Sequence, residues 1–151
     1  MALSDIWKFV AVDERLGTAG QPTEKQLADV KDGGFELVVN LGLNDPRYCL
    51  PDEAGSVAAL GMRYEHIPVD FANPTEDDFD RFCQVMTDAG ERKVFVHCAM
   101  NHRVSCFVAL YGEAKLGWSR DDGEALINRL WHPNDTWRGF MDRIRARSAS
   151  A

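Results

Sequence analysis

The sequence predicts an α/β fold built as a single domain. Segments with helical apolar spacing alternate from end to end with short runs of β-branched and aromatic residues, a pattern typical of helices around a sheet with parallel strands. A length of 151 residues is sufficient for one hydrophobic core without disulfide bonds or a structural metal. We expect one domain over residues 1–151, with a peripheral segment at 1–14 and a frayed tail at 148–151.

In the first half of the chain, two helices alternate with two strands. Thr23 and Gln26 form a capping box that opens the first helix, and Gly33 stops it. The later elements end at glycine or proline, which interrupt both helices and strands. The expected elements are the helix 23–30, the strand 35–40, the helix 52–60 and the strand 63–67.

The second half contains four helices and one strand. Thr75 begins a helix whose apolar residues fall on one face, and Gly90 ends it. Ser119 and Asp135 are residue types preferred at helix N-caps and predict two further helices. The expected elements are the helix 75–89, the strand 93–96 and the helices 103–116, 119–130 and 136–147.

Composition limits the compartment and the partners. A net charge of −7 repels nucleic acid and acidic membranes. The N-terminus lacks the features of a signal peptide, and no run approaches the roughly 20 apolar residues of a membrane span. The 4 cysteines and 4 histidines lack the spacing of disulfide frameworks or zinc sites. We therefore expect a cytoplasmic protein with reduced thiols and with no metal, cofactor, nucleic-acid partner or membrane partner.

The most informative stretch runs from Val94 to Ser105. A β-branched and aromatic run stops at His97 and Cys98, and Arg103 follows after a short loop, at the start of a helical pattern. A thiol between a strand end and a helix N-terminus faces backbone N–H groups and a positive dipole, which bind anions and lower the pKa of a thiol. The residues predict an accessible thiolate nucleophile in an anion-binding cradle.

This stretch resembles the signature of the cysteine-based protein phosphatases, specifically their compact dual-specificity-like branch. That signature is His-Cys, five loop residues, Arg, and then Ser or Thr. A bacterial family of small phosphatases is more similar still, because its members open with a Gly-Gln-Pro segment, here Gly20-Gln21-Pro22. The likeness covers about residues 15–116. It implies a phosphotyrosine-phosphatase-like fold, with a central, mostly parallel sheet of four to five strands flanked by helices, and a phosphomonoester substrate.

The loop between Cys98 and Arg103 is one residue shorter than that signature, and two interpretations remain open. Either Arg103 still closes a shorter loop, or Ser105 keeps the family's Ser/Thr place, Val104 stands where Arg belongs, and Arg103 is displaced. We favour the first, because Val104 has helical spacing with three apolar residues that should face the core. A shorter cradle has one donor fewer, and the loss of an oxyanion donor costs about 3 kcal/mol of transition-state stabilisation.

The resemblance implies roles for individual residues. Cys98 would attack phosphorus, and Arg103 would grip two phosphate oxygens as a bidentate fork. Ser105 would donate a hydrogen bond to the Cys98 sulfur, and His97 would brace the loop through backbone hydrogen bonds. Asn101 replaces the usual glycine and tolerates a positive φ. Amides would hold the remaining phosphate charge along a loop made of His97, Ala99, Met100, Asn101, His102 and Arg103; His102 is either an anion contact or a solvated loop residue.

The family also supplies a general acid from a mobile loop upstream of the nucleophile. Asp70 fits this role, because it follows a strand end between Pro68 and Pro74. Its neighbours Val69 and Phe71 should raise its pKa by desolvation. The alternative is a turn aspartate that caps local amides. Three further acids of the next helix are expected to be solvated first-turn charges: Asp77, Asp78 and Asp80.

Other residues are expected to have structural roles, with one exception. Residues 44–48 should reach the sheet edge that carries Cys98, where Arg47 or Tyr48 either contacts a substrate or belongs to a plain surface loop. Gln21 is expected to be structural. Cys83 and Cys106 are expected to be small buried hydrophobic residues. The four tryptophans are expected to be core or helix-packing residues: Trp7, Trp118, Trp131 and Trp137.

Three functions are compatible with these residues. The favoured one is a cysteine-dependent phosphomonoesterase. The second is a phosphate-binding module that has lost catalysis and keeps the cradle. The third is a sulfurtransferase, because rhodanese-type domains resemble this chain in having a four-residue loop, and a smaller ring of amides suits a persulfide. His97 and the Asp70 loop are unlike rhodaneses.

Overall fold

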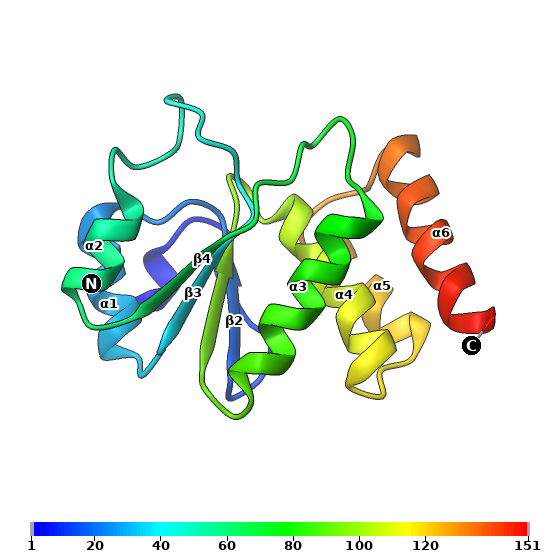
Figure 1. Ribbon diagram of the computed structural model, residues 1–151, viewed down its shortest axis with the longest axis horizontal. Coiled ribbons are helices and arrows are strands. Elements are labelled where there is room, and N and C mark those ends of the chain that lie inside the picture. The colour runs from blue at the N-terminus through cyan, green and yellow to red at the C-terminus, as the bar shows by residue number, and fades with distance from the viewer. Residues whose placement is uncertain (1, 151) are drawn as a thin grey trace.

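A five-stranded sheet forms the centre of the structure, a computed structural model that describes residues 2–150 (Figure 1). The strand order is β1-β2-β5-β3-β4, with β5 in the middle. Strands β2, β5, β3 and β4 are parallel, and only the edge strand β1 is antiparallel to its neighbour. The strands are β1 (Val10–Ala11), β2 (Leu16–Ala19), β3 (Leu37–Asn40), β4 (Arg63–His66) and β5 (Val94–His97). The predicted α/β fold with a mostly parallel sheet is confirmed.

Helices cover both faces of this sheet. In Figure 1, α1 and α2 lie on one face and α3 and α4 on the other, with α5 and α6 outside α4. The helices are α1 (Glu24–Asp32), α2 (Glu53–Ala59), α3 (Glu76–Ala89), α4 (His102–Lys115), α5 (Arg120–Asn128) and α6 (Asp135–Ser150), with a 3₁₀ turn η1 (Leu3–Asp5) before β1. No helix among the described residues is long and apolar enough to cross a membrane.

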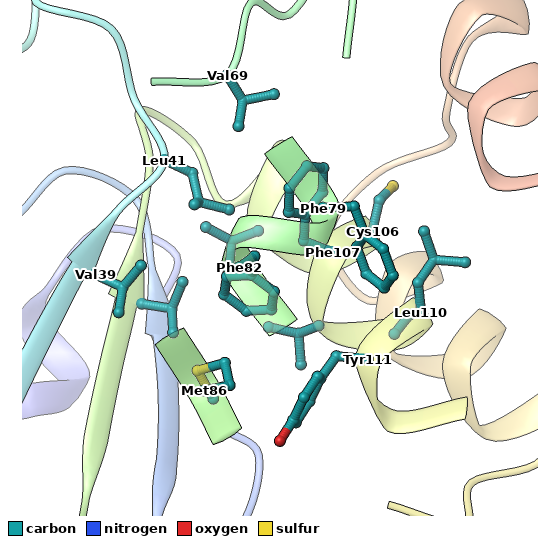
Figure 2. Close-up of a cluster of buried hydrophobic side chains, with 14 of the residues drawn as sticks. Val39, Leu41, Val69, Phe79, Phe82, Met86, Cys106, Phe107, Leu110 and Tyr111 are labelled. Carbon is teal, nitrogen blue, oxygen red and sulfur yellow. The ribbon is translucent and has the colours of Figure 1, made fainter. Parts of the chain in front are cut away.

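Two hydrophobic clusters hold the layers together, one on each face of the sheet. Side chains of β5 alternate between them: Val94 and Val96 join the cluster with α3 and α4, whereas Phe95 joins the one with α1 and α2. Figure 2 shows the first cluster, in which side chains of β3, α3 and α4 meet. Helix α4 is buried along most of its length, because it lies between the sheet and the two outer helices. Its first turn is therefore fixed from several sides.

The N-terminal region differs from the sequence prediction. Strands β1 and β2 were not expected, because Leu16–Ala19 contains glycine and alanine and lacks the alternation of a half-buried strand. Within the segment expected to be peripheral, β1 adds an edge strand to the sheet and Ile6 is buried. Trp7, expected to be a core or helix-packing residue, is 57% exposed. Capped helices agree well with the prediction, and Thr23, Thr75 and Ser119 each accept the expected N-cap hydrogen bond.

The C-terminal region also differs. Helix α6 continues through Ser150, where the sequence predicted a frayed tail over 148–151. Ala151 lies outside the described residues.

Candidate active site

Cys98 lies where the central strand ends and α4 is about to begin. β5 ends at His97, and α4 starts at His102. The Cys98 amide donates a hydrogen bond of 3.4 Å to the Ala19 carbonyl, at the end of the neighbouring strand β2. Asn101 has a left-handed backbone with φ 63°, as its residue type allows, and turns the chain into the helix. Cys98 therefore precedes the N-terminus of α4 by one short loop, in the place that the sequence predicts.

The side chain of Cys98 is buried, contrary to the accessible thiol expected from the sequence. The residue exposes 1% of its surface and belongs to the same hydrophobic cluster as Leu41 and Val69. The segment after β4 folds back at this edge of the sheet, since the Val69 amide donates to the Leu41 carbonyl at 3.1 Å. Figure 2 shows Val69 and Leu41 at one end of this cluster. In this conformation Cys98 is closed to solvent.

A buried ion pair underlies the residue before Cys98. His97 is fully buried, and its Nε2 lies 2.6 Å from Oε2 of Glu53, while its Nδ1 lies 3.4 Å from the Cys98 carbonyl oxygen. Burial would raise the pKa of Glu53, but the hydrogen bond and charge of His97 and a hydrogen bond from Gln21 lower it below its usual value. These two ring contacts hold His97 between the Glu53 carboxylate of α2 and the backbone that follows β5.

The Gly-Gln-Pro segment supports the same loop. Gln21 donates from its side chain to Oε1 of Glu53 at 2.9 Å and from its backbone to the Ala99 carbonyl at 3.0 Å. A Cβ at Gly20 would lie 2.6 Å from the Ala99 carbonyl oxygen, so only glycine fits there. The structural role expected for Gln21 agrees with these contacts. Glu53 was missed, because directly after the N-cap Asp52 it reads as an ordinary first-turn acid.

Arg103 lies in the first turn of α4 and is only 5% exposed. Its Nη1 donates to the Val69 carbonyl at 3.0 Å, and its guanidinium carbon lies 6.0 Å from the centre of the Phe71 ring. Val104 is fully buried, as the first interpretation of the short loop requires. Arg103 is thus held beside the loop that carries Asp70, with part of its fork engaged by backbone.

Ser105 does not make the hydrogen bond expected from the family resemblance. Its hydroxyl donates to the His102 carbonyl at 2.7 Å and accepts from Nε1 of Trp131 at 3.0 Å, so it is not directed to Cys98. The reason is its position one turn into the helix, where a serine hydroxyl readily bonds to the carbonyl of the preceding turn. Ser105 anchors the α5–α6 connection to α4.

An aromatic cluster stands beside Arg103, formed by Phe71, His102, Trp131 and Trp137. The His102 ring stacks on Trp131, with centroids 4.4 Å apart and planes 1° apart, so His102 is neither a free anion contact nor fully solvated. Burial, together with the charges of Lys8 and Arg103, lowers the pKa of His102. Nε1 of Trp137 donates to the Phe71 carbonyl at 2.9 Å and fastens the Asp70 loop. The tryptophans were expected only as packing residues.

Asp70 is exposed, and its Oδ1 accepts a 2.9 Å hydrogen bond from the Ala72 amide. The burial expected from Val69 and Phe71 is not found, because Val69 faces the core and Phe71 packs into the aromatic cluster. This geometry matches the alternative of a turn aspartate. Asp70 still belongs to the segment that Arg103 contacts through Val69.

The remaining loop residues have distinct surroundings. Ala99 is half-buried and accepts from the Gln21 amide, whereas Met100 is 44% exposed. The side chain of Asn101 points into the protein, where Nδ2 donates to the Lys8 carbonyl at 2.9 Å and to Oγ1 of Thr18 at 3.0 Å. Its Oδ1 is buried without a partner among the described residues. Asn101 therefore shapes the loop through its backbone and fixes it through its side chain.

The loop 44–48 reaches the same edge of the sheet. Arg47 forms an exposed ion pair with Asp45, and its hydrogen bonds lower the pKa of Asp45 to about 2. The Tyr48 hydroxyl accepts from the Leu43 amide at 2.9 Å. A Cβ at Gly42 would touch both the Tyr48 ring, at 3.2 Å, and Cα of Cys98, at 3.7 Å. Tyr48 thus flanks the loop that begins at Cys98, while Arg47 belongs to the surface.

Comparison with known proteins identifies the family. A model of the family described as DSP-PTPase phosphatase fused to NAD+ kinase matches residues 5–126. The chain belongs to this family. The resemblance seen in the sequence is thereby confirmed, because the family is one of DSP-type phosphatases and the fold is PTP-like.

Solved structures and one curated relative are similar to the chain. A crystal structure of a DUF442 protein from Shewanella putrefaciens CN-32 is 29% identical in sequence, with a TM-score of 0.87. The alignment covers 97% of this chain and 96% of the Shewanella chain. Tk-PTP in its active form shares the fold, with 18% identity, a TM-score of 0.80, and coverage of 93% and 97%. A beta-lactamase hydrolase-like protein of Agrobacterium fabrum (strain C58) is 34% identical over 110 residues, 71% of this chain and 25% of that protein. The chain spans about a quarter of the length of the curated relatives it matches.

Proposed function

We propose that this DSP-type phosphatase domain is a cysteine-dependent phosphomonoesterase in which Cys98 is the nucleophile, Arg103 the phosphate clamp and Asp70 the general acid. The observation that carries the proposal is the placement of Cys98 between the central strand and the N-terminus of α4, with Arg103 in the first turn of that helix. The contact between His97 and Glu53 supports it further, because it fixes the residue that precedes Cys98 and so the start of the loop.

The first chemical step transfers the phosphoryl group to sulfur. The Cys98 thiolate attacks phosphorus, the S–P bond forms, and the bond from phosphorus to the leaving oxygen breaks. That oxygen takes a proton from the Asp70 carboxyl group, because an alkoxide is a poor leaving group. Loop amides and the guanidinium of Arg103 hold the charge on the three remaining phosphate oxygens.

The second step hydrolyses the intermediate. Asp70, now a carboxylate, accepts a proton from a water molecule as its oxygen attacks phosphorus, and the S–P bond breaks to release phosphate and the Cys98 thiolate. The reaction requires no cofactor. We place it in the cytoplasm, where a nucleophilic thiol stays reduced.

Access to Cys98 requires the segment 67–74 to move. Val69 shares the buried cluster with Cys98, and its carbonyl accepts from Arg103. Phosphate oxygens accept from Arg103 more strongly than a backbone carbonyl does, because the bond is assisted by two charges. An entering phosphate would therefore release Val69 and the loop that carries Asp70, so binding of substrate and opening of the site are one event.

The proposal is tested by hydrolysis of p-nitrophenyl phosphate and of an alkyl phosphate under reducing conditions. Turnover of both should be lost in Cys98→Ser and retained in Cys49→Ser, since Cys49 lies outside the loop. Asp70→Asn should lower the rate for the alkyl phosphate about 10²–10⁴-fold, and the rate for p-nitrophenyl phosphate much less, because nitrophenolate leaves without a proton. Asp77→Asn is the matched control on α3.

Two outcomes would contradict the assignment. Turnover that survives in Cys98→Ser would exclude this nucleophile. A wild-type protein that binds phosphate or tungstate but hydrolyses neither ester would instead identify a phosphate-binding module without catalysis.

A further inference from the structure

A short segment before the sheet, residues 6–9, is fastened directly to the nucleophile loop. The Lys8 carbonyl accepts from the Asn101 side chain at 2.9 Å, and the Trp7 carbonyl accepts from the Gly20 amide at 2.7 Å. Ile6 is buried on one side of these bonds, and the Phe9 ring stacks on Phe95 on the other, with centroids 6.4 Å apart. The segment is therefore anchored at each of its four residues.

The backbone of this segment is held in an unfavourable conformation. Lys8, with φ 58°, and Asn101 are the two residues other than glycine with positive φ among residues 2–150. Asparagine tolerates this region better than lysine does, and the turn that contains Lys8 is closed by a 3.1 Å hydrogen bond from the Phe9 amide to the Ile6 carbonyl. Such strain persists only where surrounding contacts over-determine the backbone, and it is frequent at ligand sites. Here the two left-handed residues are joined by a hydrogen bond.

The anchored segment presents apolar surface and a positive charge beside the cradle. Trp7 is 57% exposed and Met100 44%, and they are two of three large apolar side chains that are exposed in the described part of the chain. A Cβ at Gly20 would lie 2.7 Å from the Trp7 ring, and Gly20 itself forms a β-bridge with Met100, so Trp7 and Met100 flank one backbone. Nζ of Lys8 lies 5.4 Å from the centre of the Trp7 ring.

The charge of Lys8 acts on the loop between Cys98 and Arg103. Burial lowers the pKa of His102, the residue before Arg103, and the charge of Lys8 lowers it further. In a protein with a net charge of −7, a cation at this place is positioned for an anion that approaches the cradle. Asp5 is the nearest acid along the chain, and its carboxylate is engaged by the Ala2 amide.

We propose that Trp7, Lys8 and Met100 form the subsite for the leaving group, and that this group is an aromatic ring bearing a second anionic substituent. The proposal rests on the phosphatase function proposed above. The ring would pack against Trp7 and the thioether of Met100, both favourable partners for aromatic faces and edges. The substituent would pair with Lys8. Asn101 is then a positioning residue, which keeps Lys8 in place relative to the cradle.

The experiment compares kcat/KM for phenyl phosphate and 4-carboxyphenyl phosphate in the wild type, in Lys8→Met and in the control Lys25→Met, an exposed lysine of α1. The wild type and Lys25→Met should prefer the carboxylated ester by about two- to fivefold, the range of an exposed ion pair, and Lys8→Met should lose the preference. Trp7→Ala should lower the rates for both aryl esters about two- to tenfold relative to glycerol phosphate. An unchanged carboxylate preference in Lys8→Met would overturn the subsite.

The subsite and the phosphatase function can fail separately. If both esters are hydrolysed and Lys8→Met has the wild-type ratio, the subsite falls and the phosphatase stands. If neither ester is hydrolysed, calorimetric affinities of wild type and Lys8→Met for the same two compounds decide. A carboxylate preference that depends on Lys8 supports the subsite without catalysis, and equal affinities, or no binding, overturn it.

Discussion

The buried pair of His97 and Glu53 fixes the position of the residue directly before Cys98. Breaking a buried ion pair leaves an uncompensated charge, which is costly in a site that excludes water. The pair also joins the Gly-Gln-Pro segment, α2 and β5 through one carboxylate, since Gln21 and His97 both bond to Glu53. The residue immediately before the proposed nucleophile is therefore fixed by three separate parts of the chain.

Replacement of this carboxylate should change both stability and its pH dependence. We expect Glu53→Gln to lower the free energy of unfolding at pH 7 by about 3 kcal/mol. Because folding depresses the pKa of Glu53, its stabilisation is fully present above the unfolded value of about 4.5 and is lost as the pH falls through the lower folded value. Urea unfolding between pH 3 and 7 should show the two proteins converging below pH 4.5.

The exposed Glu36→Gln provides the control for this comparison, and its curve should parallel that of the wild type. A constant difference between Glu53→Gln and wild type down to pH 3 would mean that folding does not depress the pKa of Glu53.

At the scale of elements, we expect the loop between β4 and α3 to control access to Cys98. Three contacts hold it: Arg103 to the Val69 carbonyl, Trp137 to the Phe71 carbonyl, and the packing of Phe71 among aromatic rings. Two of these contacts reach from the helical side of the molecule across to the sheet edge. The contact between Arg103 and the Val69 carbonyl also holds the backbone next to Asp70 beside the Arg103 side chain.

Loosening one of these contacts should expose the thiol. Trp137→Phe keeps most of the ring and removes the 2.9 Å hydrogen bond to Phe71, a loss of about 1 kcal/mol. We expect the rate of Cys98 alkylation by iodoacetamide, followed by peptide mass spectrometry, to rise about fivefold. Trp118→Phe, far from the loop, should leave the rate unchanged. Equal rates in all three proteins would show that another segment controls access.

The elements that the sequence predicted correctly are those with strong local signals. Helix α1 has a capping box with Gln26, and α3 has one apolar face and a terminal glycine. Strand β2 was missed because its identity depends on a partner 78 residues away, in the register of Leu16 with Val94. Gly17 is required there because a Cβ would lie 2.8 Å from the Phe35 ring, and no local sequence pattern indicates this contact.

The residues of the candidate site likewise fall into those predicted from the local motif and those fixed by contacts distant in sequence. Cys98, Arg103 and the left-handed Asn101 follow from the motif, because the strand, loop and helix are contiguous. Burial of Cys98, the partners of Ser105 and the ion pair of Glu53 depend on segments that are distant in sequence. Tertiary contacts therefore decide which motif side chains face the cradle, and they turn the serine toward Trp131.

For the whole molecule, anion binding and folding should be coupled. A ligand that binds only the folded state at 100 times its Kd stabilises it by about 2.7 kcal/mol, or roughly 5–10 °C in Tm for a chain of this size. We expect tungstate to produce such a shift in the wild type and in Cys98→Ser. Arg103→Lys should lose most of it, because lysine cannot form the bidentate fork. Arg138→Lys, whose arginine is paired with Glu124, is the control.

An absent shift in the wild type would mean that the loop amides do not form an anion site. An undiminished shift in Arg103→Lys would support the interpretation in which Arg103 is displaced from the cradle.

The most direct measurement for the central claim is acid quenching of the wild-type protein during turnover of an aryl phosphate, followed by mass spectrometry of its peptides. We expect one phosphoryl group on the peptide that contains Cys98, and none on that peptide in Cys98→Ser. A phosphoryl group on another residue, or steady turnover with no phosphorylated peptide at all, would contradict it.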